Sequence, residues 1–204
     1  MGATLAVPWA GVDPRIKGVL LSGAGGMLIE IATTATEPTD VNATLSLLSG
    51  LQGERFERTH PILHTLQTMW DLVDPVAKAQ YLVANPTDNL APKDVKMTAG
   101  HLDGYFHPRA QASLALPLGV SPLNDELHET LQSALNLAER EKQSYPLQAN
   151  LNDQCAGLVG YSADHELGHY VIFNQDQARY QYACFLASVG SAQGASIAAP
   201  ASFD

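Results

Sequence analysis

The fold class is decided by KGVLLS at Lys17–Ser22, which runs directly into GAGG at Gly23–Gly26. The middle of the first segment is apolar on both faces of an extended chain, which is typical of a parallel strand covered by helices on both sides. The glycines predict a turn at the carboxyl end of that strand. Two later segments, Asp94–Gly100 and Ala156–Tyr161, are predicted as further strands. We therefore expect about three parallel strands.

Helices are expected around these strands. They are predicted over residues 109–118 and 175–189, and residues 27–92 predict a helical, cap-like insert over a pocket. Strands that alternate with helices predict an α/β fold with a short parallel sheet. We predict a single domain over residues 1–189 and a flexible tail over residues 190–204, which are rich in Ala, Ser and Gly.

The composition is that of one globular domain. The chain has 204 residues and a net charge of −10, with 46% hydrophobic residues. This charge argues against nucleic acid and anionic membranes as partners, because both attract lysine and arginine. No apolar stretch approaches the roughly 20 residues that span a bilayer. With no signal peptide at the N-terminus, we expect a soluble, cytoplasmic protein. Cys155 and Cys184 are expected to be buried thiols.

The segment DHELGHY at Asp164–Tyr170 contains the pattern H-E-x-x-H, formed by His165, Glu166 and His169. On a helix, this spacing places both imidazoles on one face, where they can share a metal ion, and leaves the glutamate as a base. Zinc metalloproteases need the pattern inside a long helix and a third ligand downstream. Here Tyr170–Phe173 favours an extended structure and no glutamate follows. A metalloprotease is therefore disfavoured.

Three segments resemble a known family: VLLSGAGG within Lys17–Gly26, VKMTAGHLDGYFHP at Val95–Pro108, and Ala156–Leu186 with its GHY. They are similar to the C-terminal half of an α/β-hydrolase of the bacterial lipase/esterase-like group, whose members are often secreted. The resemblance implies that Asp103 is the acid and His169 the base of a serine hydrolase. The nucleophile segment G-x-S-x-G has no counterpart, because the first residues, MGAT, match those that follow that serine. The resemblance thus predicts a truncated α/β-hydrolase core.

A metal ion is the predicted replacement for the missing serine. In the resembled topology the loops after the second and third strands meet, which brings together the predicted ligands His101, Asp103, His165 and His169. Imidazoles and a carboxylate suit zinc, and manganese is the alternative. Such an ion lowers the pKa of bound water to about 7, and Glu166 or Asp103 would take the proton. The predicted activity is hydrolysis of small activated esters, carboxylic or phosphoric, including phosphotriesters.

Two alternatives stay open. Ser22 could act as a substitute nucleophile, beside the backbone amides of Gly23–Gly26 as an oxyanion site. Alternatively, Asp103 and His169 only hold the loops together, and the protein is a folded, non-catalytic fragment. In either case the first strand is expected to have an unpaired apolar edge, which predicts a homodimer through that strand.

Overall fold

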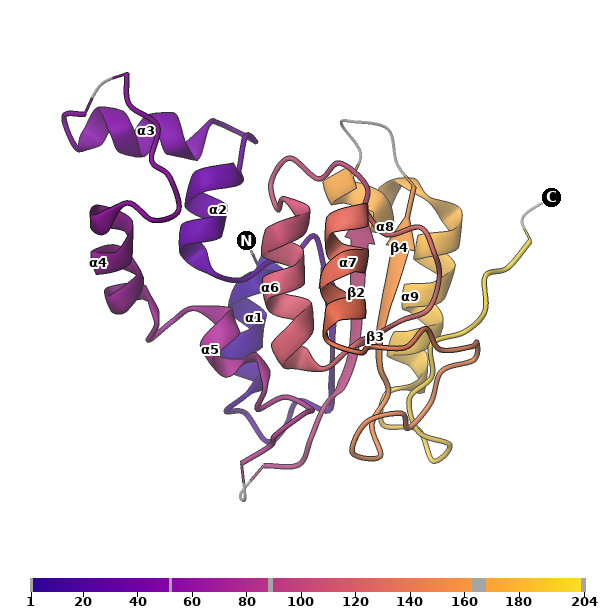
Figure 1. Ribbon diagram of the computed structural model, residues 1–204. Coiled ribbons are helices and arrows are strands. Elements are labelled where there is room, and N and C mark those ends of the chain that lie inside the picture. Colours follow the sequence, from indigo (N-terminus) through magenta and orange to yellow (C-terminus); the bar gives the residue numbers. More distant parts are fainter. Residues whose placement is uncertain (1, 52, 88–89, 163–167, 203–204) are drawn as a thin grey trace.

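The computed structural model describes residues 2–51, 53–87, 90–162 and 168–202 and shows an α/β protein (Figure 1). The described strands form one parallel sheet in the order β1-β2-β4-β3. Their bounds are Gly18–Ser22 for β1, Asp94–Gly100 for β2, Ser121–Pro122 for β3 and Ala156–Tyr161 for β4. The three predicted strands are thus confirmed as β1, β2 and β4. The fourth strand, β3, was missed because it is very short and ends in a proline.

Helices cover both faces of the sheet, as the apolar strands predict. One face packs against α1 (Gly2–Ala10), α5 (Pro75–Ala79), α6 (Pro108–Leu118) and α7 (Glu129–Leu137). The other face packs against α8 (Val171–Asn174) and α9 (Asp176–Ser188). Every residue of β2 and β4 is buried. A sheet that is covered on both faces accounts for the continuous apolar sequences of β1 and β4.

One lysine lies inside this core. Lys96 of β2 is fully buried, and its Nζ donates to the hydroxyl of Tyr161 at 3.3 Å. That hydroxyl donates in turn to Oε1 of Gln181 on α9, at 2.6 Å. Burial lowers the pKa of Lys96 to about 7, because an apolar core disfavours the charged amine.

The region from 27 to 92 is a helical lobe at one side of the sheet (Figure 1), and its described residues form no strand. It contains α2 (Leu28–Thr34), α3 (Val41–Leu48) and α4 (Pro61–Trp70) before it reaches α5. A small separate core forms around Ile29, Phe56 and Leu63. The lobe contacts the loop after β2, where the amides of Thr36 and Glu37 donate to the carbonyl of Gly104 at 2.9 and 3.1 Å. The cap-like role of this insert stays a prediction.

The predicted flexible tail differs from the structure over residues 195–198. Ile197 is fully buried and forms an antiparallel bridge with Leu147. Gly157 makes this packing possible, because a Cβ on Gly157 would lie 2.6 Å from Cδ1 of Ile197. The small residues around Ile197 concealed this anchor in the sequence, since composition averages over a single large apolar side chain.

The strand β1 lies at one end of the sheet, with β2 as its neighbour. The amide of Asp94 donates to the carbonyl of Lys17 at 3.0 Å. Because backbone groups alternate in direction along a strand, those of Gly18, Leu20 and Ser22 face away from β2. The homodimer through this edge stays a prediction.

Two further expectations concern the membrane and the cysteines. Within the described ranges, no helix is long and apolar enough to cross a membrane. Cys155 is a buried thiol and Cys184 is partly buried, and neither forms a disulfide.

Candidate active site

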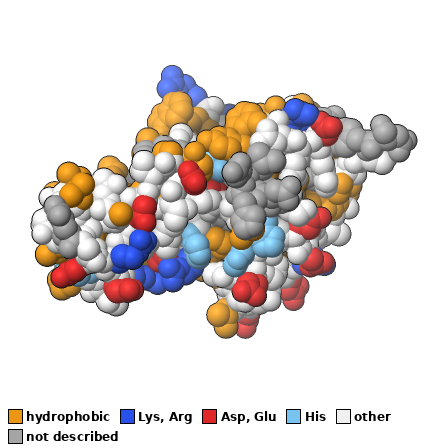
Figure 2. Space-filling view, turned by 90° about the horizontal axis from the view of Figure 1, so that it is seen from above, with side chains coloured by type: hydrophobic (Ala, Val, Ile, Leu, Met, Phe, Trp, Pro, Cys, Tyr) orange, Lys and Arg blue, Asp and Glu red, His pale blue; other side chains and the backbone are white. Residues whose placement is uncertain are grey.

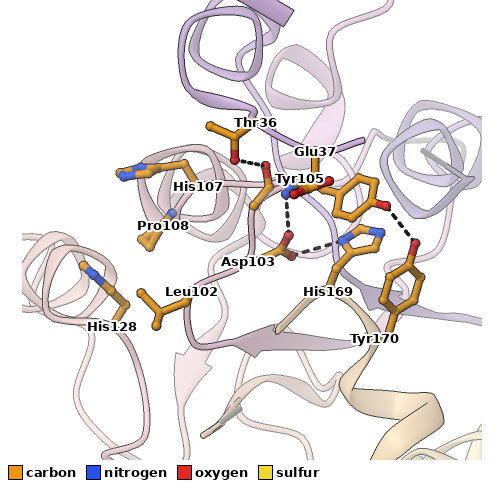
Figure 3. A pocket seen from close by; sticks show the side chains of 11 residues that line it. Thr36, Glu37, Leu102, Asp103, Tyr105, His107, Pro108, His128, His169 and Tyr170 are labelled. Atoms are coloured by element: carbon orange, nitrogen blue, oxygen red, sulfur yellow. Dashed lines mark hydrogen bonds and ion pairs between the residues drawn. The ribbon is translucent and has the colours of Figure 1, made fainter. Parts of the chain in front are cut away.

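The carboxyl ends of β1, β2 and β4 meet at one edge of the sheet, and a hollow of about 600 Å³ opens there. Its walls come from the loop after β2, the helical lobe and the segment after β4 (Figure 3). Asp103 and His169 both line it. Open α/β sheets usually place their ligand sites at this edge.

Asp103 and His169, the two residues that the resemblance singled out, lie within hydrogen-bonding distance of each other. Oδ2 of Asp103 lies 3.1 Å from Nδ1 of His169. The other carboxylate oxygen, Oδ1, accepts the amides of Tyr105 at 2.9 Å and Phe106 at 3.0 Å. The Asp103 side chain is fully buried, and that of His169 is 15% exposed. A carboxylate only accepts hydrogen bonds, so Nδ1 donates and Nε2 keeps an open lone pair.

The loop that carries Asp103 is shaped by a sharp turn. Leu102 adopts a left-handed backbone conformation, with φ of 57°. Gly104 follows, where a Cβ would lie 2.8 Å from Cγ of Glu37. The loop ends at α6, where the ring of His107 accepts the amide of Arg109 at 3.2 Å. His107 thus acts as a helix cap, and the carboxylate of Asp103 is fixed between the end of β2 and the start of α6.

Glycines allow the loops after β1, β2 and β4 to come close together around His169. Gly23 has φ of +52°, and a Cβ there would lie 2.6 Å from Cε1 and Nδ1 of the imidazole. Gly100 and Gly168 touch through their backbones, so a Cβ on either residue would collide with the other loop. Sequence patterns predict that these glycines lie in turns, but they do not predict which residues pack where a glycine Cβ would be.

The backbone around His169 is helical, whereas Tyr170–Phe173 was expected to be extended. A short 3₁₀ helix, η1 (Gly168–Tyr170), leads directly into α8. Val171 is buried against the face of the sheet that α9 covers. Tertiary packing therefore overrides the local β preference, because the chain must turn back from β4 towards α9.

Aromatic rings fix the plane of the imidazole (Figure 3). The Tyr105 ring stacks on it, with centroids 4.2 Å apart and an interplanar angle of 26°. The Tyr170 ring meets it edge-on at 4.9 Å and 87°. The Tyr170 hydroxyl donates to the Tyr105 hydroxyl at 3.0 Å.

A second hollow of about 470 Å³ lies between α1, β1 and α8. His169 and Tyr170 line both hollows, and Ser22 and Gly23 line only the second. The Ser22 Oγ is buried and has no hydrogen-bond partner within the described ranges. The candidate nucleophile of the sequence analysis is therefore in the same hollow as the candidate base.

The predicted metal ligands are only partly brought together. Asp103 and His169 meet, but their facing atoms bond each other. The His101 ring packs against His128 instead, with centroids 5.3 Å apart. His165 and Glu166 lie outside the described residues. Across the part of the chain that the structure describes, no three His, Cys, Asp or Glu side chains are arranged to hold a metal ion.

Basic side chains gather near the site, which the net charge of −10 concealed. Figure 2 views this end of the molecule and shows histidines near its middle with lysine or arginine side chains beside them. Arg109 pairs with the buried carboxylate of Glu30 at 2.6 Å, and Arg58 approaches it at 3.6 Å. Burial and the nearby charge of Arg109 lower the pKa of His107. Its imidazole is therefore mostly neutral at pH 7.

The tyrosines were missed by sequence reasoning, although Tyr105 lies two residues after Asp103 and Tyr170 directly follows His169. The local signal was their position in the sequence next to the two candidate residues.

Comparisons of the chain with protein families, with curated proteins and with solved structures find no match.

Proposed function

We propose that this protein hydrolyses small activated esters, with His169 as general base and Asp103 as the residue that orients it. The observation that carries the proposal is the contact between Nδ1 of His169 and Oδ2 of Asp103, at 3.1 Å. A buried carboxylate held by two backbone amides fixes the ring, while Nε2 stays available to a reactant. The resemblance to an α/β-hydrolase gives the two residues the same roles.

The proposed reaction uses water as the nucleophile. Nε2 of His169 accepts a proton while the water oxygen bonds to the carbonyl carbon, and a tetrahedral oxyanion forms. The oxyanion collapses, the bond to the leaving oxygen breaks, and the imidazolium returns the proton to that oxygen. Asp103 stays ionised throughout and stabilises the imidazolium.

Two rival nucleophiles are kept in the test. Ser22 lines the same hollow as His169, which is the observation in favour of attack by its hydroxyl. A metal-bound water stays a prediction from the spacing of His165 and His169. Of the other two predicted ligands, Asp103 bonds His169 and His101 packs against His128. We therefore rest the proposal on the pair of Asp103 and His169.

The test measures hydrolysis of p-nitrophenyl acetate and of diethyl p-nitrophenyl phosphate. His169→Ala should lower kcat/KM by about 10²–10⁴-fold, the usual contribution of a general base. His64→Ala is the control, because this histidine is exposed on α4 in the helical lobe. An equal rate for wild type and His169→Ala would overturn the proposal.

The same assay separates the rivals. Loss of activity in Ser22→Ala together with a burst of p-nitrophenol would identify the serine as nucleophile. Stoichiometric zinc or manganese by elemental analysis, with activity lost on chelation and restored by the metal, would identify a metal-bound water. No activity in any form would leave the folded, non-catalytic fragment.

A further inference from the structure

The hydroxyls of Tyr105 and Tyr170 form a donor pair beside the candidate base. Tyr170 donates to Tyr105 at 3.0 Å, which leaves the proton of Tyr105 to point elsewhere. Figure 3 shows both hydroxyls beyond the imidazole ring, on the side away from Asp103. Since both tyrosines line the 600 Å³ hollow, the Tyr105 hydroxyl can donate its proton to a molecule bound there.

Ring contacts hold the pair in place. Tyr105 stacks on His169 at 4.2 Å, and Tyr170 meets the Tyr105 ring edge-on, at 5.8 Å and 79°. The amide of Tyr105 is bonded to Asp103, and Tyr170 is the last residue of η1. Both phenols are thus set relative to the imidazole by the same two loops that set the pair of Asp103 and His169.

The two tyrosine hydroxyls lie on the side of the imidazole where the proposed reaction places negative charge on the carbonyl oxygen (Figure 3). Because Asp103 occupies Nδ1 of His169, the reactive nitrogen is Nε2, on the side of the ring away from Asp103. A carbonyl carbon attacked there needs a donor for its oxygen, and the phenol pair lies on that side. Both tyrosines line the 600 Å³ hollow, which is open to a substrate.

We propose that the Tyr105 hydroxyl, supported by Tyr170, binds the carbonyl oxygen of the ester and stabilises its negative charge in the transition state. This inference rests on the proposed function. Tyr105 is the catalytic residue, because its proton reaches the oxygen. Tyr170 is a positioning residue that polarises the Tyr105 hydroxyl. The ligand class is a tetrahedral oxyanion.

The experiment compares Tyr105→Phe, Tyr170→Phe and the double variant, with Tyr182→Phe on α9 as control. Phenylalanine keeps the ring contacts with His169 and removes only the hydroxyl. Tyr105→Phe should lower kcat by about 10²-fold with little change in KM, because the donor acts in the transition state. Tyr170→Phe should lower kcat by about 10-fold, and should add little in the Tyr105→Phe background. Unchanged kcat in Tyr105→Phe would overturn the inference.

A binding measurement gives a readout that does not depend on turnover. Phenylphosphonate carries a tetrahedral anion. Its Kd should be about 10-fold higher for Tyr105→Phe than for wild type, and the Kd for Tyr182→Phe should equal that of wild type. If wild type hydrolyses esters but the tyrosine variants match it in rate and phosphonate affinity, the inference alone fails. If wild type is inactive, the proposed function fails. Equal phosphonate binding by wild type and Tyr105→Phe would then overturn the inference as well.

Discussion

Nδ1 of His169 lies 3.1 Å from Oδ2 of Asp103, although 66 positions separate the two residues in the chain. The aspartate side chain is fully buried and the histidine is open on one side. This difference in exposure assigns the two roles: buried Asp103 orients the imidazole ring, and Nε2 of His169 is left to contact the reactant.

Asp103→Asn should lower kcat/KM for p-nitrophenyl acetate by about 10²–10⁴-fold. The amide keeps the size of the side chain but can no longer stabilise the imidazolium, and it can present its NH₂ group to Nδ1. Asp125→Asn is the matched control, because its exposed carboxylate only pairs with Lys142 at the surface. A variant as active as wild type, with the same melting temperature, would show that the pair has no catalytic role.

Gly23→Ala should lower activity and cost about 1–3 kcal/mol of unfolding free energy. The added Cβ would lie 2.6 Å from the imidazole of His169, at a backbone φ of +52°. Gly53→Ala is the control for backbone strain alone, since φ there is +88° and a Cβ meets nothing within 4 Å. Equal activity loss in both variants would mean that contact with His169 is not the cause.

Lys96→Met should stabilise the protein at pH 7, by about 2–4 kcal/mol, because a buried amine is costly. The pKa of Lys96 is about 7 in the fold and 10.5 in the unfolded chain. Between these values the unfolded chain binds more protons, so wild-type stability rises with pH across this window. The stability gap between variant and wild type should therefore be largest below pH 7 and shrink towards pH 10.5. Urea unfolding of both proteins from pH 6 to pH 10 measures it, and a gap independent of pH would contradict the prediction.

Ile197→Ala should cost about 2–4 kcal/mol of unfolding free energy, the usual loss when a fully buried isoleucine is truncated. Thermal and urea unfolding would measure the change. Leu186→Ala is the control, because Leu186 on α9 is 47% exposed and should change stability by less than about 1 kcal/mol. A negligible effect of Ile197→Ala would mean that the tail contributes nothing to the fold.

The open edge of β1 predicts a homodimer, measurable by light scattering during size-exclusion chromatography. Phe173 lines the hollow next to this edge and is 65% exposed, so Phe173→Glu should convert a dimer to a monomer. Leu72→Glu in the helical lobe should leave the dimer intact, although Leu72 is 79% exposed. A wild-type protein that is monomeric at all concentrations would rule out the dimer.

Sequence patterns predicted the strands better than the site. Apolar segments without alternation identified β1 and β4, because a strand covered on both faces has no polar side. The two-residue β3 left no such signal. Burial of Lys96 was also hidden, since its partners, Tyr161 and Gln181, come from segments far along the chain.

The sequence by itself determined the α/β class, because strand burial is a local property, and its resemblance to a known family made Asp103 and His169 candidates. Only the tertiary structure decided which side chains meet. It paired Asp103 with His169, turned His101 to His128, and placed Tyr105 on the imidazole. These contacts join loops that are distant in the chain, and they depend on glycines whose missing side chains leave room for another loop. No local sequence pattern specifies which loop packs against these glycines. The set of side chains that meet in the site is therefore decided by tertiary packing.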